Sequence, residues 1–176
     1  MTIEILLIRH GETDWNRLGL FQGQTDIPLN SKGEEQAKSL AEKLKIAYPS
    51  LHAIYSSDLQ RAHFTAAPSA HLWQLPIHTS KELREIHYGK AEGLPIDTSS
   101  LGKNSCENAE TYEEVLFRVK AHILTLSKNH KAGQTVAIFT HGRVIHLLIE
   151  DSLGNKSPAS ISNCAIAKFL YFPQEE

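Results

Sequence analysis

Two short motifs in this 176-residue chain place a histidine and a glycine at the end of an apolar run. Arg9, His10 and Gly11 follow the run ILLI, and His141 and Gly142 follow AIFT. Glycine allows close approach to the backbone because it has no side chain. An arginine beside the first histidine offers a planar set of donors that matches phosphate. Two such motifs facing one point would bind an anion such as a phosphoryl group.

Two further side chains extend this set. Arg61 stands in SSDLQRAHFTA, at a predicted strand-to-helix junction, where it could complete a cage around the same phosphate. Glu85 stands in the glycine-containing segment ELREIHYGKAEG, and its carboxyl group could protonate a leaving oxygen. These parts fit phosphoryl transfer in which an unprotonated His10 attacks phosphorus and the arginines neutralise the charge of the transition state.

This scheme requires neither a metal nor another cofactor. The sequence contains no H-E-x-x-H motif, no C-x-x-C pair and no dense aspartate cluster. Cys106 and Cys164 are far apart in the sequence and are expected to be ordinary thiols of a reducing compartment.

The pattern between these motifs predicts alternating strands and helices. Strands are expected at 3–8, 51–57, 75–80, 134–140 and 163–172, and helices at 31–47, 58–67, 111–130 and 142–153. The alternation predicts an α/β fold of three layers, with a mostly parallel central sheet flanked by helices. Ligands of such sheets bind beyond the carboxyl ends of the strands, where both histidines stand, so the two motifs are expected to share one site.

Capping and breaking residues predict where two of these helices begin and end. Ser31 and Glu34 have the spacing of a capping box at the start of the first helix. The second helix is expected to begin near Ser57 or Asp58 and to end at Pro68, because proline disrupts helical hydrogen bonding.

Length and composition are those of an ordinary globular protein. The chain is expected to form one domain over residues 1–176, with 41% hydrophobic residues and a net charge of −2. That charge gives no reason to expect nucleic acid or a membrane surface as a partner. The start of the chain lacks a signal-peptide pattern and no run spans a bilayer, so a cytoplasmic location is expected.

Six segments resemble, in order, the motifs of the histidine phosphatase superfamily. They are LLIRHGETDWN, FQGQTDIPLNSKGEEQA, IYSSDLQRAHFTA, LREIHYGKAEG, ETYEEVLFRV and FTHGRVIHLL, and they cover nearly the whole chain. The superfamily includes cofactor-dependent phosphoglycerate mutases and α-ribazole phosphatases, and this chain is closest in size to small members such as the latter. The resemblance implies a phosphoglycerate mutase-like fold and chemistry without metal.

The resemblance also implies a role for particular residues. His10 would be the phosphorylated nucleophile and Glu85 the proton donor. Arg9, Arg61 and His141 would bind the phosphoryl group. The residues that contact the substrate would be Asn16, Gln22, Gly23 and Gly142.

Other candidates are expected to be structural or remain open. Trp15 and Tyr88 could either line the cleft or pack beside it. The remaining histidines are expected to be surface or core residues: His52, His63, His71, His78, His87, His122, His130 and His146.

The stretch from Leu94 to Ala109 decides which reaction is expected. It is shorter than the corresponding insertion of phosphoglycerate mutases, and a short lid admits water and so favours hydrolysis. We therefore expect a phosphatase of the histidine acid phosphatase type, acting on phosphorylated small molecules. A mutase-type phosphotransferase, a phosphohistidine protein phosphatase and a non-catalytic phospho-ligand binder stay open as alternatives, as does the oligomeric state.

Overall fold

A single mixed sheet of five strands forms the centre of the protein. The computed structural model describes residues 2–96, 107–153 and 160–171. The strands are β1 (Ile3–Arg9), β2 (Ala53–Ser57), β3 (Ile77–Ser80), β4 (Thr135–Thr140) and β5 (Ile166–Tyr171). Their order is β3-β2-β4-β1-β5, with β3, β2, β4 and β1 parallel and β5 antiparallel to β1. The five predicted strands are confirmed, and β5 lies at one edge of the sheet.

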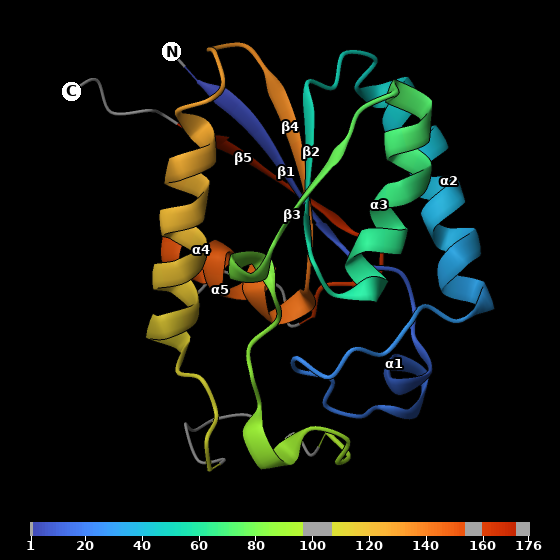
Figure 1. Ribbon diagram of the computed structural model, residues 1–176, viewed down its shortest axis with the longest axis vertical. Coiled ribbons are helices and arrows are strands. Elements are labelled where there is room, and N and C mark those ends of the chain that lie inside the picture. Colours follow the sequence, from blue (N-terminus) through green and yellow to red (C-terminus); the bar gives the residue numbers. More distant parts are fainter. Residues whose placement is uncertain (1, 97–106, 154–159, 172–176) are drawn as a thin grey trace.

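Helices cover both faces of this sheet (Figure 1). On one face lie α2 (Ser31–Ala47) and α3 (Gln60–Trp73), and on the other lie α4 (Tyr112–Ser127) and α5 (Gly142–Leu153). The short helix α1 (Asp14–Leu18) and two single 3₁₀ turns, η1 (Lys81–Leu83) and η2 (Gly89–Ala91), lie in the connections. The structure therefore confirms the predicted three-layer α/β fold.

The first strand shows why this sequence forms a central strand. Leu6 and Ile8 pack into the core under α2 and α3, whereas Ile5 and Leu7 pack into the core under α4 and α5. Each of these side chains is at most 2% exposed. An apolar run buried on both faces is typical of a parallel strand between two helical layers.

The register of β1 against β4 brings the two histidine motifs together. Arg9 lies opposite Thr140, and the N–H of His10 donates to the carbonyl oxygen of Thr140 at 3.0 Å. Because the strands are parallel and end at the same level, His10 and His141 emerge side by side at one edge of the sheet.

The prediction of a Ser31–Glu34 capping box is wrong, although α2 does begin at Ser31. The N-cap is Asn30, whose side-chain oxygen accepts the N–H of Gly33 at 2.9 Å. Asn30 has extended backbone dihedrals, which is the usual geometry of a residue just before a helix. Asparagine caps a helix as well as serine does. The cap therefore lies one residue earlier than predicted.

The predicted limits of α3 are also wrong. The helix begins at Gln60, where the carboxylate of Asp26 accepts the first N–H at 2.8 Å. It continues through Pro68 to Trp73. Ala66 before the proline is fully buried, and Ala70 and Trp73 after it pack against the same core, which offsets the missing hydrogen bond. The helix predicted to reach His130 ends at Ser127.

Two glycines allow the loop after β1 to lie against the start of α2. A Cβ atom at Gly11 would lie 2.6 Å from the carbonyl oxygen of Gly33, and a Cβ at Gly33 would lie 2.1 Å from that of Glu12. The backbone after His10 is therefore held directly against the backbone of α2.

The close approach of the two backbones at Gly33 predicts that a larger residue there destabilises the protein. Gly33→Ala should lower the free energy of unfolding by about 1–3 kcal/mol, because the added methyl group pushes two backbone segments apart. Urea denaturation checks this against Ser39→Ala, an exposed change on the same helix that should cost less than about 0.5 kcal/mol. Equal stability of the two variants would contradict the prediction.

Candidate active site

A cavity of about 430 Å³ opens at the carboxyl ends of β1 and β4. Of the residues predicted for the site, those that line this cavity are Arg9, His10, Asn16, Gln22, Gly23, Arg61, Glu85 and Gly142. His141 is fully buried directly behind them, with its ring centroid 5.2 Å from that of His10. The structure thus brings all the predicted site residues together.

The ring of His10 is fixed in one tautomer by its neighbour. Its Nδ1 lies 2.7 Å from the carbonyl oxygen of Gly11. A carbonyl oxygen only accepts hydrogen bonds, so Nδ1 carries the proton and Nε2 is the unprotonated nitrogen of the neutral ring. The side-chain amide of Asn163 donates to the carbonyl oxygen of His10 at 3.0 Å and holds the backbone here.

Both histidines remain neutral because of where they lie. Burial lowers the pKa of His10 well below its usual value, and the positive charges of Arg61 and Arg9 lower it further. Burial and Arg61 also lower the pKa of His141, with His10 contributing. A neutral imidazole retains the lone pair that a nucleophile needs.

The guanidinium groups of Arg61 and Arg9 are held by backbone carbonyl groups. Arg61 donates from Nη1 to Thr25 at 2.9 Å and from Nη2 to Gly23 at 2.7 Å. Arg9 donates from Nη1 to the carbonyl oxygen of Ile161. Burial lowers the pKa of Arg61 to about 10, which leaves it charged at neutral pH. A buried cation, Arg61, and a partly buried one, Arg9, therefore line the same cavity as His10.

Several polar atoms at this point are buried without a hydrogen-bond partner among the described residues. They are Nε of Arg9, Nε of Arg61 and both ring nitrogens of His141. Buried polar groups are normally paired, and unpaired donors beside two positive charges fit an anionic ligand. Gly142 leaves room for the side chain of Arg9, because a Cβ atom at this position would lie 3.2 Å from Nε of Arg9.

Glu85 also lines the cavity and is only 8% exposed. One of its carboxylate oxygens accepts the N–H of Ile86 at 3.0 Å, and the other accepts the N–H of Arg143 at 3.2 Å. The second contact ties Glu85 to the first turn of α5, next to His141. This carboxyl group is therefore fixed relative to both histidine motifs.

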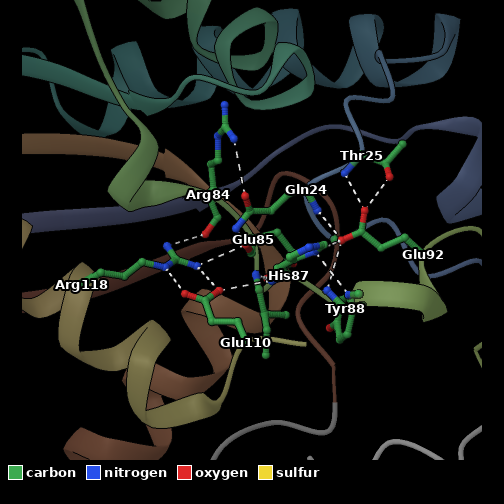
Figure 2. Close-up of polar contacts among 12 residues, drawn as sticks. Gln24, Thr25, Arg84, Glu85, His87, Tyr88, Glu92, Glu110 and Arg118 are labelled. Atoms are coloured by element: carbon green, nitrogen blue, oxygen red, sulfur yellow. Dashed lines mark hydrogen bonds and ion pairs between the residues drawn. The ribbon is translucent and has the colours of Figure 1, made fainter. Parts of the chain in front are cut away.

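Arg118 of α4 holds the segment that carries Glu85 (Figure 2). Its guanidinium donates to the carbonyl oxygens of Arg84 at 2.8 Å and Glu85 at 3.2 Å. It also pairs with both oxygens of Glu110, at 2.6 and 2.9 Å. Sequence reasoning missed this role, because an arginine within an amphipathic helix gives no sign of which backbone it will contact.

Two of the side chains that line the cavity are amides held through their oxygens. The Oε1 of Gln22 accepts from the hydroxyl of Thr13 at 2.9 Å. The Oδ1 of Asn16 accepts from the amide of Asn163 at 3.2 Å. Each side chain is left with its N–H₂ group as the donor that it can offer to a ligand.

Other lining residues were not predicted, or were left open. Tyr88 lines the cavity, and burial raises the pKa of its hydroxyl. His146, expected to be structural, also lines it and pairs with Glu150 at 3.2 Å. The other lining residues are Leu20, Phe21, Ile96, Arg143, Ser160 and Ile161.

Residues 2–96, 107–153 and 160–171 contain no group of three or more histidine, cysteine or acidic side chains placed to hold a metal ion. Within the same ranges, no helix is long and apolar enough to cross a membrane. Cys106 lies outside the described residues.

Residues 5–175 match the family model of the histidine phosphatase superfamily, branch 1. The chain therefore belongs to this superfamily.

Individual relatives are similar over most of the chain. The uncharacterised phosphatase PhoE of Bacillus subtilis is 38% identical over 85% of this chain and 77% of its own length. A metal-independent phosphoserine phosphatase of Arabidopsis thaliana is 35% identical over 82% of this chain and 66% of its own. The mycobacterial glucosyl-3-phosphoglycerate phosphatase, solved with VO3, has a TM-score of 0.83 and 26% identity over 94% of this chain and 91% of its own. Phosphoglycerate mutases are also among the similar proteins.

The geometry predicts how the two histidines respond to an anion. In the free protein, His10 and His141 should stay neutral well below the ordinary pKa of 6.5. Inorganic phosphate should raise both pKa values, because its negative charge offsets the repulsion from Arg61 and Arg9. NMR titration of the ring C–H signals, with and without phosphate, measures this. A normal pKa for either ring in the free protein, or no response to phosphate, would contradict the arrangement described.

Proposed function

We propose that this protein is a metal-independent phosphatase that hydrolyses phosphomonoesters of small molecules through a phosphohistidine on His10. The observation that carries the proposal is the neutral ring of His10, with Nε2 unprotonated, in one cavity with Arg9 and Arg61, whose buried Nε donors have no partner within the described part of the chain. The phosphatases among the relatives support the same reaction class. The family match over residues 5–175 supports a single domain over the whole chain.

The first half of the reaction transfers the phosphoryl group to the enzyme. The lone pair on Nε2 of His10 forms the N–P bond as the ester P–O bond breaks. The proton on Nδ1 stays there, hydrogen-bonded to the carbonyl oxygen of Gly11. Glu85, in its protonated form, gives its proton to the departing oxygen. Arg9, Arg61 and His141 hold the phosphoryl oxygens while charge develops on them.

The second half returns the enzyme to its starting state. Glu85, now a carboxylate, takes a proton from a water molecule as the water oxygen attacks phosphorus. The N–P bond breaks, its electron pair returns to Nε2 of His10, and inorganic phosphate leaves. In this scheme the arginines supply the positive charge that a metal ion supplies in many other phosphatases. The relative named as a metal-independent phosphoserine phosphatase supports this assignment.

The nucleophile assignment predicts the effect of one substitution. The wild-type protein should hydrolyse p-nitrophenyl phosphate in excess EDTA, and His10→Ala should lose about 1,000-fold or more, because the covalent route is removed. Release of p-nitrophenol, followed by absorbance, measures this. His71→Ala, an exposed change distant from the cavity, serves as the control. Equal rates for wild type and His10→Ala would exclude the phosphohistidine mechanism.

The proton-donor assignment predicts a dependence on the leaving group. Glu85→Gln should reduce kcat for glycerol 3-phosphate by about 100-fold or more, because an alkoxide needs a proton as it leaves. The loss for p-nitrophenyl phosphate should be much smaller, since p-nitrophenolate is a stable anion. Comparing kcat for the two substrates tests the role, and equal losses would argue that Glu85 is not the acid.

A further inference from the structure

One peptide group joins Arg61 to a second carboxylate, Glu92. The peptide that links Gly23 to Gln24 donates its N–H to Oε1 of Glu92 at 2.9 Å. The carbonyl oxygen of the same peptide accepts from Nη2 of Arg61 at 2.7 Å. Because a peptide group is planar and rigid, its orientation is fixed from both sides at once. Each hydrogen bond also polarises the peptide in the direction that strengthens the other.

The next residue, Thr25, lies between the same two side chains. Thr25 donates its N–H and its hydroxyl to Oε2 of Glu92, at 2.9 and 2.5 Å, and accepts from Nη1 of Arg61 at 2.9 Å through its carbonyl oxygen. The segment from Gly23 to Thr25 therefore lies between a carboxylate and a guanidinium. Figure 2 shows Glu92 facing Gln24 and Thr25.

Glu92 also binds the segment that follows Glu85. Its Oε1 accepts the N–H of Tyr88 at 3.1 Å and lies 2.7 Å from Nδ1 of His87. Its side chain is only 11% exposed. The carboxylate thus connects the segment that holds Arg61 with the segment that leads away from the proposed acid.

The contact between Glu92 and the 23–25 segment requires a glycine at position 23. A Cβ atom there would lie 2.0 Å from Oε1 of Glu92, and its φ of +53° is rarely adopted by other residues. The glycine makes room for the carboxylate, and it also lines the cavity. The positions of Gly23 and Glu92 therefore depend on each other.

We propose that Glu92 is a positioning residue that fixes the 23–25 segment, and through it the guanidinium of Arg61, in the geometry that binds the phosphoryl group. It is not among the residues that line the cavity, and it acts through two backbone carbonyl groups. The proposal rests on the proposed function in that it takes Arg61 to be a phosphate ligand.

The test is binding of inorganic phosphate, which requires no turnover. Glu92→Gln keeps the shape of the side chain but replaces one acceptor oxygen with an N–H₂ group, which would face backbone donors. Phosphate should then bind about tenfold more weakly by isothermal titration calorimetry, because the segment that orients Arg61 is released. With p-nitrophenyl phosphate as substrate, KM should rise in parallel.

Glu110→Gln is the matched control. Glu110 is also a nearly buried carboxylate, 16% exposed, and it accepts the N–H of His87 at 3.2 Å. It pairs with Arg118, and within the described residues its carboxylate makes no hydrogen bond or ion pair with the 23–25 segment. Glu110→Gln should leave the dissociation constant of phosphate within about twofold of wild type. The reason is that Glu110 acts on Arg118 and the segment that carries Glu85, and not on the segment that holds Arg61.

Two results would overturn the proposal. One is an unchanged dissociation constant of phosphate in Glu92→Gln, and the other is an equal weakening in both variants, which would indicate a general structural effect. If Glu92→Gln does not fold, as judged by thermal unfolding, Thr25→Val removes only the hydroxyl contact with Glu92 and should weaken phosphate binding to a smaller but measurable extent. Phosphate binding without turnover would reject the proposed hydrolysis while the role of Glu92 is still tested.

Discussion

The structure depends on holding the guanidinium groups of Arg9 and Arg61 close to the imidazoles of His10 and His141, largely out of contact with water. Removing a cation from water is costly unless other groups replace its hydration. Here the replacement comes mainly from backbone carbonyl groups, those of Gly23 and Thr25 for Arg61 and that of Ile161 for Arg9. The histidines contribute no charge, because burial and the arginines hold their pKa values low. The site is thus positive and only partly compensated, which is the condition that favours a phosphoryl group.

The sheet makes this arrangement possible with little local strain. Parallel pairing of β1 with β4 places both histidines at one edge, where the chain leaves the sheet and its backbone groups become available. Gly11 and Gly142 then allow close contacts, one with the backbone of α2 and the other with the side chain of Arg9. The glycine after each histidine therefore serves a distinct packing purpose, although the two motifs look alike in the sequence.

The sequence predicted those parts of the molecule that depend on local pattern. The strands, the three layers and the grouping of the site residues could be inferred, because apolar runs and strand-end motifs are local signals. Asn30 and Asp26 show the limit. Asn30 caps α2, although the spacing of the adjacent Ser31 and Glu34 indicated a different cap. Asp26 caps α3 from a position 34 residues earlier in the chain. The contacts of Arg118 and Glu92 could not be inferred either, because both bind backbone groups of segments without regular structure.

The segment between Glu82 and Glu92 explains how one loop can position both Glu85 and the segment that holds Arg61. Near its start, Arg118 and the first turn of α5 hold Glu85, and the hydroxyl of Thr140 donates to the carbonyl oxygen of Leu83 at 2.8 Å. At its end, Glu92 holds the segment that orients Arg61. The loop is therefore anchored to β4, α4 and α5 on one side and to the 23–25 segment on the other. A displacement of either anchor changes the distance between Glu85, the proposed proton donor, and Arg61, the proposed phosphoryl ligand. An irregular stretch in this position therefore needs as many fixed contacts as a regular element would provide.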